Sequence, residues 1–282
     1  MLQNGVRLFL SLSSRLTFLI FKHKEDILPV SLVLALTVLD FALYFTVDSV
    51  AVLVGYWLLM LLPKGVICAW NHHHQHTMTF RAAPLNRLLE LAYALHTGVT
   101  SHLWVLHHVL GHHHHYLDQH QDESRWARKD GSTMGPLEYA WDVASTAYYR
   151  GYQVGKRFPK AQRIYLTFTA VTFVLLLVLC WFKPLQAVFL FVLPMAVSLY
   201  FTAWVTYYHH SGLHTDDPYE ASYNNTGRLF NVLTGNLGYH TAHHLKQGVH
   251  WSKLPALHAE IAHRIPASLY KPSTFSVLLG KA

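Results

Sequence analysis

The fold is decided by an apolar stretch that reads Ile164-Tyr-Leu-Thr-Phe-Thr-Ala-Val-Thr-Phe-Val-Leu-Leu-Leu-Val-Leu-Cys-Trp-Phe182. It contains no charged side chain and is long enough to cross the ~30 Å hydrocarbon core of a membrane as an α-helix. Lys183-Pro184 interrupts the run, because proline lacks the backbone N–H that a continuing helix needs. A second apolar run then reaches Tyr207. The sequence therefore predicts two antiparallel membrane spans that are joined by a tight turn.

Another hairpin is expected near the N-terminus, where apolar residues extend from Ile27 to Leu62 with a break near Asp48. Its second span is short, and it could continue toward Trp70 past a break at Pro63. The composition agrees with membrane insertion: 52% of the residues are hydrophobic and 13% are charged, whereas about 25% are charged in soluble domains. We expect an all-α integral membrane protein whose four transmembrane helices lie at residues 27–46, 49–63, 164–182 and 185–206.

The 22 Lys and Arg residues are unevenly distributed around these spans. Four precede the first span, 11 lie between Lys64 and Arg163, six follow Tyr207, and only Lys183 lies in a loop on the other side. Because loops rich in Lys and Arg stay in the cytoplasm, both termini and the central segment are predicted to be cytoplasmic. The net charge of +7 fits loops that meet anionic lipid head groups, and no interleaving of basic and aromatic residues suggests nucleic-acid binding.

The segment between the two hairpins is expected to form a cytoplasmic helical cap. Residues 85–106 are apolar enough to lie along the membrane surface or dip into it, 117–135 are polar and predict a loop, and 136–155 predict a surface helix. Residues 1–22 predict an amphipathic interfacial helix. With no linker or repeat, the whole chain, 1–282, is expected to be a single domain.

Most of the 23 histidines gather in three clusters and one pair, at residues 71–76, 107–115 and 239–244 and at His209-His210. Within each cluster they recur at intervals of three or four residues, as in His72 and His76, which places them on one face of a helix. Each cluster can therefore aim two or three imidazoles at a common point. Neutral imidazole suits Fe, Zn, Cu or Ni. These candidate ligands exceed what one ion can bind, so the sequence predicts a two-metal site on the cytoplasmic side.

The clusters resemble the three histidine boxes of the integral-membrane fatty-acid desaturase and hydroxylase superfamily. The segment from Gly238 to His244, followed by His250-Trp-Ser-Lys-Leu-Pro255, is similar to the third box of desaturases. The second box and the segment Thr206-Tyr-Tyr-His-His-Ser-Gly-Leu213 look more like those of bacterial alkane hydroxylases. The three boxes read His72-x-x-x-His76, His108-x-x-x-His112-His113 and His240-x-x-His243-His244.

This resemblance implies a cytoplasm-facing di-iron site. In the superfamily, reduced iron activates O2, and the oxidised site removes a hydrogen atom from an unactivated C–H bond. Loss of a second hydrogen gives a double bond, whereas return of oxygen gives an alcohol. The electrons are expected to come from a separate ferredoxin, rubredoxin or cytochrome b5-type donor. The nine ligands implied are His72, His76, His108, His112, His113, His210, His240, His243 and His244.

Three functions remain open. Desaturation of a fatty-acyl or lipid chain is favoured by the third box. Hydroxylation, acetylenation or oxidative decarboxylation on the same scaffold is favoured by the second-box spacing and by His210. A His-rich zinc or nickel transporter should place its ligands near the middle of the bilayer, whereas these clusters lie at its edge, and a membrane haem protein would use fewer histidines.

Other residues carry weaker expectations. His73 and His74 should point away from the ligand face, while His114 and His115 either support ligands or compete with the assigned register. Asp40 lies inside the first span, where we expect a hydrogen bond to a Thr or Tyr of the bundle. Candidate acidic partners of the ligands are Asp118, Asp122, Glu123, Asp216 and Asp217, and candidate residues lining an acyl tunnel are Trp70, Trp104, Tyr200 and Trp204.

Overall fold

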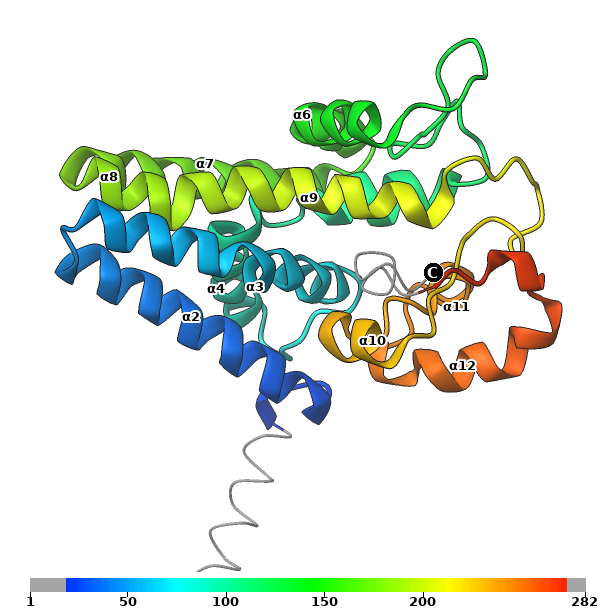
Figure 1. Ribbon diagram of the computed structural model, residues 1–282, viewed down its shortest axis with the longest axis horizontal. Coiled ribbons are helices and arrows are strands. Elements are labelled where there is room, and N and C mark those ends of the chain that lie inside the picture. The colour runs from blue at the N-terminus through cyan, green and yellow to red at the C-terminus, as the bar shows by residue number, and fades with distance from the viewer. Residues whose placement is uncertain (1–18, 273–282) are drawn as a thin grey trace, which may run out of the picture.

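The computed structural model describes residues 19–272, and the regular elements in that range are all helices, with single-residue β-bridges and no strand. Four helical stretches are long and apolar enough to cross a membrane: α2 (Ile27–Thr46), α3 (Val50–His76), α7 (Pro159–Phe182) and the stretch from Pro184 to His210. They form two hairpins whose turns lie at the same end of the molecule (Figure 1). The expected all-α, four-span architecture is confirmed. The interfacial helix predicted at 1–22 falls almost entirely outside the described residues.

The predicted spans differ from the helices mainly at their ends. α2 occupies the predicted range 27–46. α3 runs through Pro63 to His76, so the predicted span 49–63 was too short and the alternative, that it continues toward Trp70, is confirmed. A proline removes one intrahelical hydrogen bond and kinks a helix, and here the helix continues on both sides of it. α7 begins at Pro159, five residues before the predicted start, with proline in its first turn, where the missing N–H has no cost.

The fourth span changes its helical type near its start. It consists of α8 (Pro184–Ala187), the π-helix η3 (Val188–Val192) and α9 (Leu193–His210), which follow one another without a gap. The predicted range 185–206 therefore ended one turn too early.

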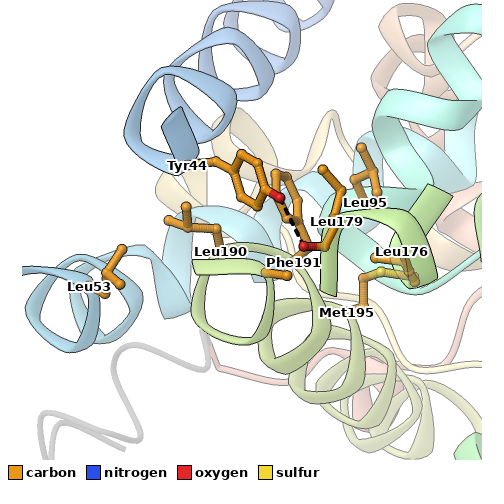
Figure 2. Packing of buried hydrophobic residues seen from close by; sticks show 9 residues of the cluster. Tyr44, Leu53, Leu95, Leu176, Leu179, Leu190, Phe191 and Met195 are labelled. Atoms are coloured by element: carbon orange, nitrogen blue, oxygen red, sulfur yellow. Dashed lines mark hydrogen bonds between the residues drawn. The ribbon is translucent and has the colours of Figure 1, made fainter. Parts of the chain in front are cut away.

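The spans pack around a core near the hairpin turns (Figure 2). Tyr44 of α2 is buried there, and its hydroxyl donates a hydrogen bond of 2.8 Å to the carbonyl of Leu179 in α7. Phe191 and Leu190 of the π-helix fill the space between these helices. Large apolar side chains on the outer faces, such as Leu177 and Trp181, are exposed, as expected where lipid covers the protein.

α4 (Ala83–Thr97) is more deeply buried than the sequence suggested. It packs against α2, α3 and α9. This packing fits the expectation that residues 85–106 dip into the membrane better than the alternative that they lie along its surface. α4 ends at Gly98, whose φ of 69° is left-handed. A Cβ on Gly98 would stand 2.5 Å from the carbonyl oxygen of Met195, so only glycine permits this close approach to α9.

The remaining elements lie away from the hairpin turns. α6 (Pro136–Gly155) forms where a surface helix was predicted, and residues 117–135 contain no helix, as expected. The π-helix η2 (Val105–His112) packs against α6 and continues into α5 (His113–His115). The last helices lie at the end of the molecule opposite the hairpin turns (Figure 1): α10 (Arg228–Thr234), α11 (His240–Leu245) and α12 (Leu254–Ile261).

Candidate metal centre

The histidine-bearing ends of five elements converge away from the hairpin turns. They are the last turns of α3 and α9, together with η2, α5 and α11. All nine predicted ligands come together here, although they are spread over 173 positions of the sequence from His72 to His244. Eight of them are buried and His76 is half-buried.

Five of these histidines form a first group, whose ligand nitrogens all lie within 4.8 Å of one another. The Nε2 atom of His108 is 2.8 Å from the Nε2 of His72 and 3.0 Å from that of His113. The members of the first group are His72, His76, His108, His113 and His243.

The other four histidines form a second group beside the first. The Nε2 of His210 is 3.3 Å from that of His112 and 3.0 Å from that of His240, and the Nε2 atoms of His240 and His244 are 3.2 Å apart. The two groups share a boundary, because the rings of His113 and His244 stack with their centroids 4.0 Å apart.

Each cluster brings two imidazoles to a common group, as expected, but the second and third clusters also contribute one ligand to the other group. His108 and His113 meet although they are five residues apart, because a π-helix brings i and i+5 onto the same face. His112, four residues after His108, instead belongs to the second group. The third cluster divides in the same way, with His243 in the first group and His244 in the second.

The donor set fits metal ions. The single Nε2 of His108 faces two other Nε2 atoms at hydrogen-bonding distance, yet an imidazole nitrogen carries either one proton or one lone pair. Nitrogens bound to one ion at ~2.1 Å and at right angles are about 3.0 Å apart, which is close to the Nε2–Nε2 contacts of 2.8 to 3.3 Å described above. The Nε2 of His243 and both ring nitrogens of His76 are buried without a hydrogen-bond partner among the described residues.

Electrostatics favour the same conclusion. Burial, together with the neighbouring imidazoles, holds the pKa values of His108, His113 and His243 well below the ordinary value of 6.5. The same causes lower the pKa values of His240 and His244. The imidazoles are therefore neutral at physiological pH, which is the form that binds a metal ion.

Two hydrogen bonds orient ligands of the second group through their Nδ1 atoms, on the side of the ring away from the Nε2 that faces the group. The Nδ1 of His112 is 2.8 Å from Oδ1 of the buried Asp122, and the Nδ1 of His210 is 2.8 Å from the carbonyl oxygen of Ala221. Such contacts fix the tautomer, so that Nε2 is left free for the ion. Of the five acidic candidates, Asp122 makes this contact, whereas Asp216 and Asp217 are exposed.

Asp122→Asn is expected to lower metal affinity by about 10- to 100-fold, because the amide no longer holds His112 through a charged acceptor. A chelator titration of bound metal measures the change. Asp118→Asn is the matched control, since Asp118 bonds to the backbone of His120 and to Gln121 in the same loop. Equal affinity of the Asp122 variant and the native protein would contradict the orienting role.

The flanking histidines have other partners. The Nε2 of His73 is 2.9 Å from the carbonyl oxygen of Thr234, and the Nδ1 of His74 is 2.9 Å from Thr79. Both point away from the ligand groups, as expected. His114 is exposed and His115 half-buried, and neither belongs to a group.

Sequence reasoning missed two contacts near the centre. The half-buried ring of Tyr116 packs on His244 with centroids 4.4 Å apart. His23, Glu25 and His250 form a separate set of possible ligands outside the two histidine groups. Both ring nitrogens of His250 are already engaged, with Asp26 at 3.0 Å and Ser252 at 2.9 Å, so this cluster is better explained as a structural contact.

A cavity of about 270 Å³ opens onto both histidine groups. Its walls come from α3, α6, α9 and α10, and among the residues that line it there is no Asp, Glu, Lys or Arg. Trp104 and Trp204 line it as expected, whereas Trp70 instead packs on Trp251 at 5.1 Å. Tyr200 is also absent from its lining. The histidines at its polar end are His72, His107, His108, His112, His209, His210 and His240.

A family model described as fatty acid desaturase matches residues 22–275. Neither a curated protein nor a solved structure matches the chain.

Proposed function

Because the chain belongs to the fatty acid desaturase family, we propose that it is a di-iron enzyme that introduces a double bond into the acyl chain of a fatty acid or lipid. The chain is a membrane oxidoreductase of the fatty-acyl desaturase or hydroxylase type with a His-rich metal site. This follows from its family membership, its four apolar helices and its histidine groups. The particular reaction, iron as the metal, and O2 as the oxidant belong to the proposal.

We assign one iron ion to each histidine group. His72, His76, His108, His113 and His243 would hold one ion, and His112, His210, His240 and His244 the other. When bound and reduced by two electrons, the pair of ions supplies the chemistry that couples reduction of O2 to water with removal of two hydrogens from adjacent carbons. A separate ferredoxin, rubredoxin or cytochrome b5-type protein would supply those electrons.

The protein's own part is to seat the chain and exclude water. The uncharged walls of the cavity suit an alkyl chain, and an alkyl chain lying in it would displace water from the histidines. Members of both groups, such as His108 and His210, border the same cavity, so a methylene there would face both metal positions. A charged head group or carrier would find no partner in these walls and would remain outside.

The observation that carries this proposal is an apolar cavity that opens onto both histidine groups. Mass spectrometry of total lipids and volatile hydrocarbons tests it, in cells that express the chain together with a ferredoxin and its reductase. A loss of two hydrogens from an acyl chain, absent with His240→Ala, is the expected result. Unchanged lipids and hydrocarbons with each of the three donor classes supplied would refute the proposal.

Hydroxylation, acetylenation or oxidative decarboxylation is the alternative. It is favoured by His210, which corresponds to the extra motif of the alkane hydroxylases and lies within the second group. A gain of oxygen in the product would indicate hydroxylation, and a terminal alkene one carbon shorter would indicate decarboxylation. Either product would keep the metal site and replace the desaturase assignment.

We also propose that the histidine groups and both termini face the cytoplasm, as the distribution of Lys and Arg suggests. The hairpin-turn end carries Lys183, whereas the exposed Lys246 and Lys253 follow the third histidine box. In a Cys180→Ser background, a membrane-impermeant maleimide should label Lys183→Cys in intact cells. Lys253→Cys should react only after the cells are opened, and labelling of Lys253→Cys in intact cells would reverse the orientation.

A further inference from the structure

An ion pair is buried in the membrane-spanning bundle, away from the histidine groups. The Nζ of Lys64 in α3 is 2.7 Å from Oδ2 of Asp40 in α2, and both side chains are almost completely buried. Tyr56 donates a hydrogen bond of 2.7 Å to the other oxygen of Asp40. The Nδ1 of His96 in α4 is 3.4 Å from the carboxylate. Asp40 therefore does bond to a tyrosine, as predicted, but its main partner is a lysine that the sequence had placed in a cytoplasmic loop.

Lys64 also bonds to the fourth span. Its Nζ donates a hydrogen bond of 2.9 Å to the carbonyl oxygen of Leu190 in the π-helix. The ammonium group thus connects α3 to α2 and to η3 through directional contacts. Apolar side chains packed at the same place would hold these helices together without fixing how far one slides past another.

The contacts fall at the weakest part of α3. Pro63 removes one intrahelical hydrogen bond, and Gly65 has a low intrinsic preference for the helix. Gly65 is also tightly packed, because a Cβ there would lie 3.0 Å from the ring of Phe201. Lys64 lies between Pro63 and Gly65, so its contacts with α2 and η3 restrain α3 at the point where the helix would otherwise bend most easily.

The direction of α3 beyond this point determines where its ligands lie. His72 follows Lys64 by eight residues, which is about 12 Å along a helix. A change of about 10° in the kink would move His72 by about 2 Å. Metal–ligand bonds tolerate deviations of only about 0.2 Å.

We infer that Asp40 and Lys64 are positioning residues: their buried pair fixes the register and kink of α3, and thereby holds His72 and His76 at the metal site. The pair's contribution is to geometry more than to stability, since replacing a buried ion pair by apolar residues of similar volume is often neutral or stabilising. The inference rests on the proposed function only through its metal site and holds for any reaction performed there.

The test compares thermal stability with metal content in the purified full-length protein. Asp40→Leu or Lys64→Met alone leaves an unpaired buried charge, so Tm should fall by about 6 to 20 °C and metal should be lost. The double variant Asp40→Leu/Lys64→Met should regain most of the Tm. It should nevertheless bind less than half of the metal that the native chain binds, as measured by elemental analysis after equilibration with Fe²⁺.

Two further variants separate positioning from folding. Asp40→Asn/Lys64→Gln keeps a directional hydrogen bond without charge and should restore metal content toward the native value. Lys183→Met removes the exposed pair with Asp48 at the hairpin-turn end and should change neither quantity. If the apolar double variant does not accumulate as folded protein, Tyr56→Phe is tested in its place. For Tyr56→Phe we expect a several-fold weaker metal affinity and a nearly native Tm.

The outcomes distinguish this inference from the proposed function. Native metal content in the apolar double variant, or native affinity in Tyr56→Phe where that variant is used, would overturn the positioning role alone. A native chain that binds no metal would overturn the metal centre and the positioning role together.

Discussion

His240→Ala is expected to abolish product formation and to weaken metal binding by more than about 100-fold, because loss of a ligand exceeds the 10- to 100-fold effect of losing an outer partner. His240 belongs to the second group, with its Nε2 3.0 Å from that of His210 and 3.2 Å from that of His244. Product yield and bound iron per chain are the two measurements.

The control for this variant is His114→Ala, which removes an exposed imidazole from a position adjacent to a ligand. It should keep native iron content and product yield. The Tm of metal-free His240→Ala should stay close to that of the metal-free native protein. Equal losses in the two variants would show that the ligand assignment is wrong.

Acidification is expected to release the metal. Protons compete with metal for each imidazole, and several must bind for each ion lost, so the release should be steep in pH. Bound iron should stay constant above about pH 7 and leave between about pH 6.5 and 4. Dialysis at graded pH followed by elemental analysis measures this, and an iron content unchanged down to about pH 4 would contradict all-histidine ligation.

The metal-free protein should lose stability over the same range. In the unfolded chain a histidine gains its proton near the ordinary pKa of 6.5, whereas burial lowers the pKa of His107 in the folded protein to about 3. Between these values the unfolded state binds more protons, so stability is fully present above about pH 6.5 and falls as the pH decreases. Denaturant unfolding of the metal-free protein at several pH values measures the slope, and a stability that rises on acidification would contradict it.

Much of the architecture could be predicted because hydropathy and charge act locally. The first span, 27–46, coincides with α2, since uninterrupted apolar residues and a polar turn define both of its ends. The end of α3 could not be predicted in this way. Pro63 weakens the helix, and the contacts of Lys64 that hold it there are with Asp40 and Leu190, which are 24 and 126 positions away in the sequence. Lys64 therefore looked like a loop cation, although it is buried in the bundle.

The sequence predicted which histidines lie close together, but it did not predict how they are arranged, and their role as metal ligands stays a prediction. Helical spacing and family resemblance identified nine histidines that the fold brings together. Their division into groups of five and four depends on the π-helix at Val105–His112, which has no recognisable sequence signal here. Asp122, which orients His112, was one of five acidic candidates in the sequence. The sequence could not single it out, because only the path of the loop decides which carboxylate reaches His112.

The boundary between the two histidine groups affects how they bind metal ions. His112 and His113 are consecutive residues that serve different groups, as are His243 and His244. A backbone movement that admits or releases one ion must therefore displace ligands of the other. We expect filling to be cooperative, so that at half-saturation most chains hold either no ion or two, and a singly loaded chain is a minor species.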